Sequence, residues 1–314
     1  MIKLAQFYDV GDLTKLPDIT VIIVTFNHQT EIRGCLNSLS KVRGSYTTEI
    51  LIIDNNSTDD TVNSAIDELA KFNRRKNWQI IQNYSNAGFT KATNQGIELS
   101  TGRYILLLNP DTRIPEDIFS KLIPVFQTDS RLGILSPQFR NADGTIQPSC
   151  RRFPRHRDLL FASFGLNRFF PGNKQFNFWQ MGDFDFLTDR YVEQPQGAFL
   201  LTHRQALEDV GFLDEKFPMF FSDVDWCFRF IKKGWKILFV SSVKIIHDKG
   251  SSVYKNRFKM IWSSHRSFHL YFKKHYSQKR MRPVNFFTGQ LLILLAALRS
   301  LYYLLVQRNS WKAH

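Results

Sequence analysis

The feature that most constrains the fold is an alternation of short apolar runs and helix-like segments along residues 19–108. Four runs are short, apolar and free of charge until their last residue; they read ITVIIVT (19–25), ILIID (50–54), WQIIQ (78–82) and YILLL (104–108). Such runs are typical of strands that are buried on both faces. We expect helices over 28–40, from the turn at 54–60 to about 71, and over 90–100. This alternation predicts a mostly parallel α/β sheet with helices on both sides.

The second half of the chain has a less regular pattern. A hairpin is expected over 134–149 with its turn at Asp143-Gly144, followed by a long variable segment over 151–190. The remaining expected elements are strands at 197–202 and 235–240 and helices over 204–210, 224–233 and 255–275.

The positive charge of the chain is large and unevenly placed. The 42 Lys and Arg residues exceed the 28 Asp and Glu residues, which gives a net charge of +14. Nine of the basic residues lie between 255 and 282, just before the apolar segment 285–307. This pattern is typical of a membrane-facing region. The apolar segment is long enough to span a bilayer, although Arg299 makes spanning costly, and a helix in the interface or packed on another chain fits equally well.

The cysteines and the N-terminal residues bear on the compartment. Cys35, Cys150 and Cys227 are far apart and odd in number, so neither a disulfide framework nor a cysteine metal motif is visible. This favours a reducing compartment. Residues 1–18 lack the apolar core of a signal peptide.

Polar clusters follow the expected carboxyl ends of the first four strands. They lie at 25–27, 54–57, 83–88 and 109–111. Ligands of parallel sheets bind at this edge, so four clusters favour a shared site. The sequence contains no GxGxxG after the first strand and no GxxxxGK[ST], which argues against a dinucleotide fold and P-loop chemistry. A divalent metal with oxygen ligands is another way to hold phosphates, and Asp111 is well placed for it.

The stretch FFSDVDWCFRF (220–230) places two carboxylates among aromatic side chains. We expect a helix start here with Ser222 as the N-cap. Asp223, surrounded by rings, is a candidate general base with a raised pKa. Asp225 lies on another face of the helix and is expected to be structural. His247 is a lone histidine, and it becomes a metal ligand only if the fold brings it to Asp111.

Taken together, these segments resemble the family 2 glycosyltransferases, which are inverting enzymes with a GT-A (nucleotide-diphospho-sugar transferase) fold. The matching stretches occur in the family's order; they are VIIVTFNHQTEIRGCLNSL, ILIIDNNSTDDT, NAGFTKATNQG, YILLLNPDT, QGAFLLTHRQALEDVGFLDEKFPMFFSDVDWCFRFIKKGW and IIHDKGSS. The sequence looks most similar to bacterial rhamnosyltransferase-like enzymes of cell-surface polysaccharide synthesis. The resemblance implies an N-terminal extension (1–16), a GT-A domain (17–250) and a basic and apolar helical segment (251–314).

The resemblance also implies roles for single residues. Those implied to line the nucleotide pocket are Thr25, Asn27, Asp54 and Asn55, and those implied to form its wall beside the sugar are Asn86, Gly88 and Asn94. Asp111 and His247 would bind a Mg²⁺ or Mn²⁺ ion that bridges the donor diphosphate. Asn109 belongs to the same nucleotide-sugar site, in the first position of an Asn-Pro-Asp motif. Asp223 matches the catalytic base, and Ser222 stands where many members have a glutamate.

The function that the resemblance implies is transfer of a sugar, L-rhamnose from dTDP-L-rhamnose, onto a polyprenyl-diphosphate-linked saccharide. Such an enzyme would work at the cytoplasmic face of the bacterial inner membrane. An inverting transfer needs a base and a means of stabilising the leaving diphosphate, and no nucleophile motif is present. A homodimer remains open, and no nucleic acid partner is expected. The alternatives are another UDP- or GDP-sugar donor, a basic nucleic-acid-binding protein and a non-catalytic scaffold.

Overall fold

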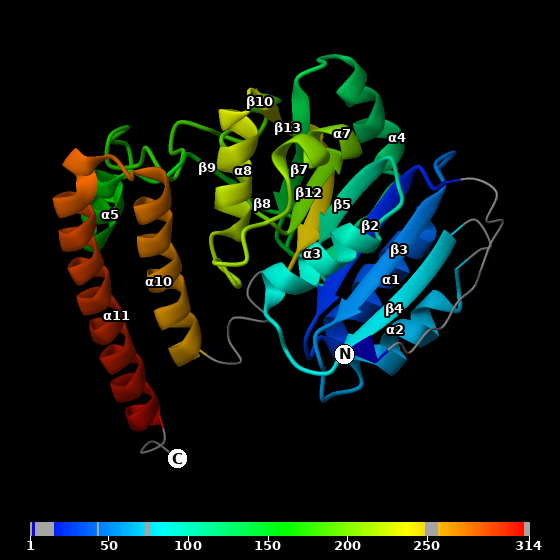
Figure 1. The fold of residues 1–314 in the computed structure, drawn as a ribbon, viewed down its shortest axis with the longest axis horizontal. Helices are drawn as coiled ribbons and strands as arrows, with labels where there is room; N and C mark the ends of the chain where they lie inside the picture. Colours follow the sequence, from blue (N-terminus) through cyan, green and yellow to red (C-terminus); the bar gives the residue numbers. More distant parts are fainter. Residues whose placement is uncertain (1, 4–15, 43, 73–75, 249–256, 311–314) are drawn as a thin grey trace.

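The N-terminal half of the chain forms the parallel part of one large sheet (Figure 1). The computed structural model describes residues 2–3, 16–42, 44–72, 76–248 and 257–310. Strands β2 (Ile19–Thr25), β3 (Thr48–Asp54), β4 (Lys76–Asn83) and β5 (Tyr104–Leu108) run parallel in the order β4-β3-β2-β5. Helices α1 (Gln29–Lys41), α2 (Thr61–Leu69) and α3 (Phe89–Leu99) connect them. The four predicted strands and three predicted helices are therefore confirmed.

The second half of the chain completes an eleven-stranded mixed sheet. Its strands are β6 (Thr112–Arg113), β7 (Leu132–Arg140), β8 (Ile146–Gln147), β10 (Arg190–Tyr191), β12 (Phe199–His203) and β13 (Lys236–His247). Strand β12 lies antiparallel between β5 and β7, and β13 runs parallel to β7. The predicted hairpin is present as β7 and β8, and Gly144 in its turn has φ +83°. At the far edge, β1 (Ile2–Lys3) pairs with β4, and a small separate sheet joins β9 (Cys150–Arg151) to β11 (Gln194–Pro195).

Helices cover both faces of the sheet, as predicted. One face packs against α1, α2, α4 (Phe119–Leu122) and the 3₁₀ helix η1 (Ile123–Gln127). The other packs against α3, α7 (Arg204–Val210) and α8 (Ser222–Lys232). The variable segment contains α5 (His156–Ser163) and α6 (Leu166–Phe169). Because alternate residues of β2 and β5 enter the two cores, every residue of both strands is buried.

A helical hairpin stands beside the sheet (Figure 1). It consists of α10 (Arg257–His275), the 3₁₀ turn η2 (Lys279–Met281) and α11 (Arg282–Ser310). Phe268, Tyr271 and Phe272 of α10 pack on Phe217 and Val224, next to the start of α8. The predicted start of this helix at 255 lies outside the described residues. In the described part of the chain, one stretch, Lys279–Leu305, is long and apolar enough to cross a membrane by length and composition.

Candidate active site

The polar ends of β2 and β3 are joined into one hydrogen-bonded rim. Thr25 Oγ1 donates to Asp54 Oδ1 at 2.9 Å, and the Ser57 amide donates to Asp54 Oδ2 at 3.0 Å. Asn27 adopts a left-handed conformation with φ 56°, and its side-chain oxygen accepts from the Thr58 amide at 2.7 Å. The first two predicted clusters therefore lie together at the carboxyl edge of the sheet.

Asn55 links this rim to the third cluster. Its Nδ2 donates to Asn86 Oδ1 at 2.9 Å, and its Oδ1 accepts from the Ala87 amide at 3.1 Å and from Asn83 Nδ2 at 3.3 Å. Asn55 is buried. The Asn55 carboxamide therefore bonds to the end of β4 and to the loop before α3, and these bonds fix the position of that loop at the rim.

Gly88 and Asn94 hold the loop that leads into α8. Gly88 has φ +91°, and a Cβ at this position would lie 3.1 Å from the Pro218 carbonyl oxygen, so a glycine is required here. Asn94 makes a reciprocal pair with Leu213: its Nδ2 donates to the Leu213 carbonyl at 2.9 Å, and the Leu213 amide donates to its Oδ1 at 3.0 Å. Both residues position the wall formed by residues 213–218.

The structure brings Asp111 and His247 together. Strand β13 continues past the predicted end at 240, through an irregularity between Val240 and Lys244, and pairs His247 with Thr112. His247 Nε2 then lies 3.5 Å from Asp111 Oδ1, and both side chains are buried. Asp111 and His247 are 136 positions apart in sequence, and the pairing of β13 with β6 brings them together. The sequence pattern did not predict this pairing.

Gln147 fixes the ring of His247. Its Nε2 donates to the Asn141 side-chain oxygen at 2.7 Å and to the His247 carbonyl at 3.1 Å. The Oε1 of Gln147 is therefore the atom that lies 2.7 Å from His247 Nδ1, and it accepts a hydrogen bond from that nitrogen. In the neutral ring, the Nε2 lone pair is then directed at the Asp111 carboxylate.

Two facing acceptors fit a divalent cation. A lone pair and a carboxylate oxygen 3.5 Å apart repel each other unless a cation or a proton lies between them. No third histidine, cysteine or carboxylate joins them within the described residues, so phosphate and water would supply the other ligands, as is usual for Mg²⁺. The residues present therefore fit the expected metal.

The segment before β12 connects Asp223 to the region of the Asp111–His247 pair through two hydrogen bonds that its backbone makes. The Asn109 amide donates to the Ala198 carbonyl at 2.9 Å, and the neighbouring Gly197 amide donates to Asp223 Oδ2 at 3.0 Å. A Cβ on Gly197 would lie 3.0 Å from Asp223 Oδ2, so the glycine permits this contact. The backbone of Gly197 and Ala198 therefore bridges Asp223 and the strand end that carries Asp111.

Asp223 lies in a cavity of about 200 Å³. The cavity is also lined by Arg151, Trp179, Gln194, Phe220 and Phe221. Burial raises the pKa of Asp223, and hydrogen bonds from the Val224 and Gly197 amides offset part of that effect. The raised pKa agrees with the sequence prediction.

The predicted N-cap is wrong. Phe221 occupies the N-cap of α8 with φ 68°, and Ser222 is the first helical residue. The Ser222 hydroxyl donates back to the Met219 carbonyl at 3.3 Å. The Ser222 hydroxyl is therefore bonded to the turn that precedes the helix, and the side chain of the N-cap residue Phe221 makes no hydrogen bond to the amides of α8.

Asp225 points away from the cavity, as predicted. Its fully buried carboxylate lies 2.9 Å from Arg229 Nε, 2.6 Å from Lys274 Nζ and 2.7 Å from His275 Nε2. Burial alone would raise the pKa of Asp225, but these partners outweigh it and lower the pKa to about 2. Helix α8 therefore carries a cavity-facing carboxylate and a second one that anchors α10.

Gln147 and Gly197 were missed at the sequence level. Gln147 gave no signal, because a glutamine in a hairpin strand is ordinary. Gly197 did carry a usable signal, because a glycine at the start of a strand often marks a close approach of another chain segment to the backbone.

The fold and the site define the class of protein: a glycosyltransferase with a GT-A fold. The family description Glycosyl transferase family 2 matches residues 20–187, and the chain belongs to this family. It is an enzyme related to rhamnosyltransferases and other polysaccharide synthases.

Two curated relatives cover most of the chain. N-acetylglucosaminyl-diphospho-decaprenol L-rhamnosyltransferase of Mycobacterium tuberculosis is 26% identical over 271 residues, which is 82% of this chain and 85% of the relative. The low-salt glycan biosynthesis hexosyltransferase Agl10 of Haloferax volcanii is 25% identical over 240 residues, which is 75% of this chain and 69% of the relative.

Solved structures share the fold. A mannosyltransferase from Pyrobaculum calidifontis, solved with GDP-Man and Mn²⁺, has a TM-score of 0.56 at 15% identity and covers 99% of this chain and 85% of its own. TarS 1–349 of Staphylococcus aureus, solved with UDP-GlcNAc, has a TM-score of 0.51 at 16% identity, with 84% and 74% covered. These likenesses confirm the expected GT-A fold.

Proposed function

We propose that the protein is an inverting transferase that moves L-rhamnose from dTDP-L-rhamnose onto a polyprenyl-diphosphate-linked saccharide. The observation that carries the proposal is the arrangement of Asp223 in its cavity and the Asp111–His247 pair, joined through Gly197 and Ala198. The name of the mycobacterial relative supports the rhamnosyl donor and the lipid-linked acceptor. Another UDP- or GDP-sugar donor is the alternative.

Each side chain has a defined part in this reaction. Asp223 accepts the proton of the acceptor hydroxyl as that oxygen attacks the anomeric carbon, and the Gly197 amide keeps the carboxylate turned toward the cavity. Asp111 and His247 would hold a divalent metal, which stabilises the charge of the departing nucleoside diphosphate. Gln147 keeps the His247 lone pair in the orientation that a metal requires. A single attack opposite the leaving group inverts the anomeric configuration.

A thermal-shift panel of nucleotide sugars tests the donor. With Mg²⁺ or Mn²⁺ present, we expect dTDP-L-rhamnose at about 100 times its Kd to raise the melting temperature by about 4 °C, because it binds only the native state. The Asp111→Asn variant should lose the metal-dependent part of this shift. The Glu116→Gln variant, at a partly exposed carboxylate, is the matched control and should keep the metal-dependent shift.

The outcomes of this panel separate the rival functions. A larger shift with a UDP- or GDP-sugar would favour the alternative donor. No shift with any nucleotide sugar, with or without metal, would contradict the transferase proposal and favour a non-catalytic scaffold.

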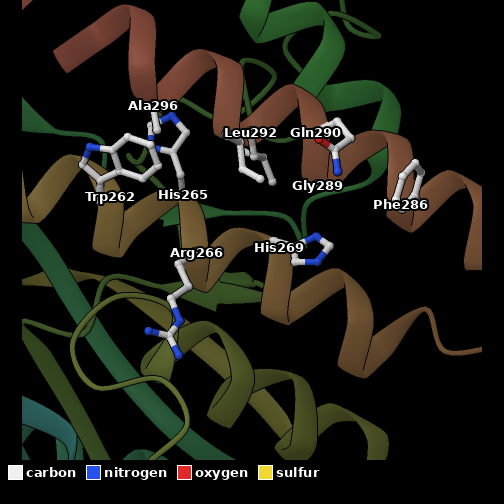
Figure 2. A pocket seen from close by; sticks show the side chains of 10 residues that line it. Trp262, His265, Arg266, His269, Phe286, Gly289, Gln290, Leu292 and Ala296 are labelled. Carbon is white, nitrogen blue, oxygen red and sulfur yellow. The ribbon is translucent and has the colours of Figure 1, made fainter. Parts of the chain in front are cut away.

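We also propose that the helical hairpin holds the enzyme at the cytoplasmic face of the membrane, where the lipid-linked acceptor would lie. Between Val284 and Leu305 most exposed side chains of α11 are apolar, with Gln290 and Arg299 as polar exceptions. The exposed apolar side chains include Phe286, Phe287, Ile293, Leu294, Leu298, Leu301, Leu304 and Leu305. A cavity of about 360 Å³ lies between the two helices, and Figure 2 shows Trp262 and His265 of α10 beside Leu292 and Ala296 of α11. Exposed apolar surface of this extent next to basic residues suits an anionic lipid surface.

Polar substitutions on the outer surface of α11 test the membrane proposal. Replacing Leu298, Leu301 and Leu305 by Ser should lower partitioning onto anionic vesicles roughly tenfold or more, because each half-exposed leucine would otherwise enter the lipid. Vesicle sedimentation measures the bound fraction. The same changes at the exposed residues Tyr84, Leu99 and Leu187 of the sheet domain should leave it unchanged. Equal loss in both triple variants would contradict membrane binding through α11.

A further inference from the structure

Arg151 is a cation in the same cavity as Asp223. It lies on β9, opposite Gln194 of β11, and its guanidinium sits 5.5 Å from the centroid of the Trp179 ring. Within the part of the chain that the structure describes, this guanidinium makes no hydrogen bond or ion pair. The contrast with its neighbours is clear, since Arg152 pairs with Asp183 at 2.7 Å and Arg155 pairs with Asp158 at 2.8 Å.

The setting of Arg151 makes an unpaired charge costly. Burial lowers the pKa of its guanidinium, and a cation among apolar walls loses free energy unless an anion accompanies it. Asp223 lines the same cavity, yet the two residues form no ion pair within 4.0 Å in the described structure. The carboxylate therefore stays available as a base, and the cation stays available for another anion.

The size of the cavity limits what can lie between the two charges. Its volume of about 200 Å³ is below the roughly 300–1,000 Å³ of a typical ligand pocket, so it suits a part of a ligand such as one sugar ring. A pyranose whose C3 or C4 hydroxyl reaches Asp223 presents its anomeric substituent on the other side of the ring. An anion attached there would meet Arg151.

We propose that Arg151 forms a subsite for a phosphate ester group on the anomeric carbon of the acceptor sugar. The inference rests on the proposed function and adds to it the residue that distinguishes a phosphate-linked acceptor from a neutral glycoside. Trp179 and Phe221 both line the cavity and both contact Phe268 of α10, at ring distances of 5.5 and 4.7 Å. A lipid beyond the phosphate would therefore leave the cavity toward the helical hairpin.

Titration with farnesyl diphosphate tests this subsite without knowledge of the acceptor sugar. All titrations contain saturating dTDP and Mg²⁺, so that the donor phosphate site is filled. We expect Arg151→Gln to weaken binding of farnesyl diphosphate about 10- to 100-fold, the range for loss of a charged hydrogen bond, and to leave binding of uncharged farnesol unchanged. The Arg168→Gln variant removes the same charge from an exposed position on α6 and should bind both probes like the wild type.

Each other result overturns the proposal. These results are no binding of farnesyl diphosphate to the wild type at millimolar concentration, an unchanged affinity in Arg151→Gln, and equal weakening by Arg168→Gln. Equal weakening of farnesol would show that Arg151 only supports the cavity wall. Failure of the proposed function is distinguishable, because the phosphate subsite can be present in a protein that transfers no sugar in the nucleotide-sugar assay.

Discussion

Asp223→Asn should lower the transfer rate about 10²- to 10⁴-fold and leave nucleotide binding intact. The substitution keeps the shape of the side chain, and its one acceptor oxygen keeps the hydrogen bond from either the Gly197 or the Val224 amide, while the other amide then faces the NH₂ group. It removes the only function that the base performs, which is to take the proton of the attacking hydroxyl. Initial rates at saturating donor and acceptor measure the loss, and the thermal shift with dTDP and Mg²⁺ measures binding.

The raised pKa of Asp223 gives this prediction a pH dependence. The base acts when it is deprotonated, so the rate falls as pH falls through its pKa. Because burial raises that pKa above the usual 3.8, the acidic limb of the pH–rate profile should lie above that value. The same raised pKa means that the charged carboxylate opposes folding at neutral pH, whereas the protonated form favours folding at lower pH. The Asn variant removes this charge cost and loses one of the two amide hydrogen bonds, so its stability at pH 7 should stay close to that of the wild type.

A matched variant separates this effect from a general loss of charge. Asp209 is an exposed carboxylate on α7, and Asp209→Asn should transfer sugar at the normal rate. Normal turnover of Asp223→Asn would show that another group is the base. A lost nucleotide-induced shift in Asp223→Asn would show instead that the substitution disturbs the donor site.

Local patterns predicted the parallel strands and their polar ends. Residues 19–108 repeat a strand–helix unit, and the clusters at Asp54, Asn86 and Asp111 meet because parallel strands share a carboxyl edge. Each of these features depends on neighbouring residues in sequence.

Contacts between distant strands could not be predicted in this way. Nothing in residues 197–202 shows that β12 inserts antiparallel beside β5, yet this pairing places Gly197 next to Asn109 and thereby orients Asp223. Similarly, only the pairing of β13 with β6 brings His247 to Asp111. The failed N-cap at Ser222 belongs to the same group, because the left-handed residue Phe221 ends a loop that α3 holds through distant contacts at Leu213 and Pro218.

The anchor at Asp225 is expected to matter most for stability. Asp225→Ala should lower the free energy of unfolding by about 3–5 kcal/mol, because it leaves Arg229, Lys274 and His275 around a buried site without their shared anion. Two of these partners, Lys274 and His275, belong to α10, so the loss also weakens the attachment of the hairpin to α8. Urea unfolding followed by circular dichroism measures the change.

Acid titration and a surface pair provide the controls for this prediction. The folded-state pKa of Asp225, about 2, lies below its usual 3.8, so its contribution is complete above that usual value and is lost as pH falls toward 2. The stability difference between wild type and Asp225→Ala should shrink over that interval. Glu116→Ala breaks an exposed pair with Lys121 and should cost less than about 1 kcal/mol. An equally small effect at Asp225 would show that other contacts hold the hairpin, such as the packing around Phe268 and the Lys274–Asp214 ion pair, and the carboxylate would then have no anchoring role.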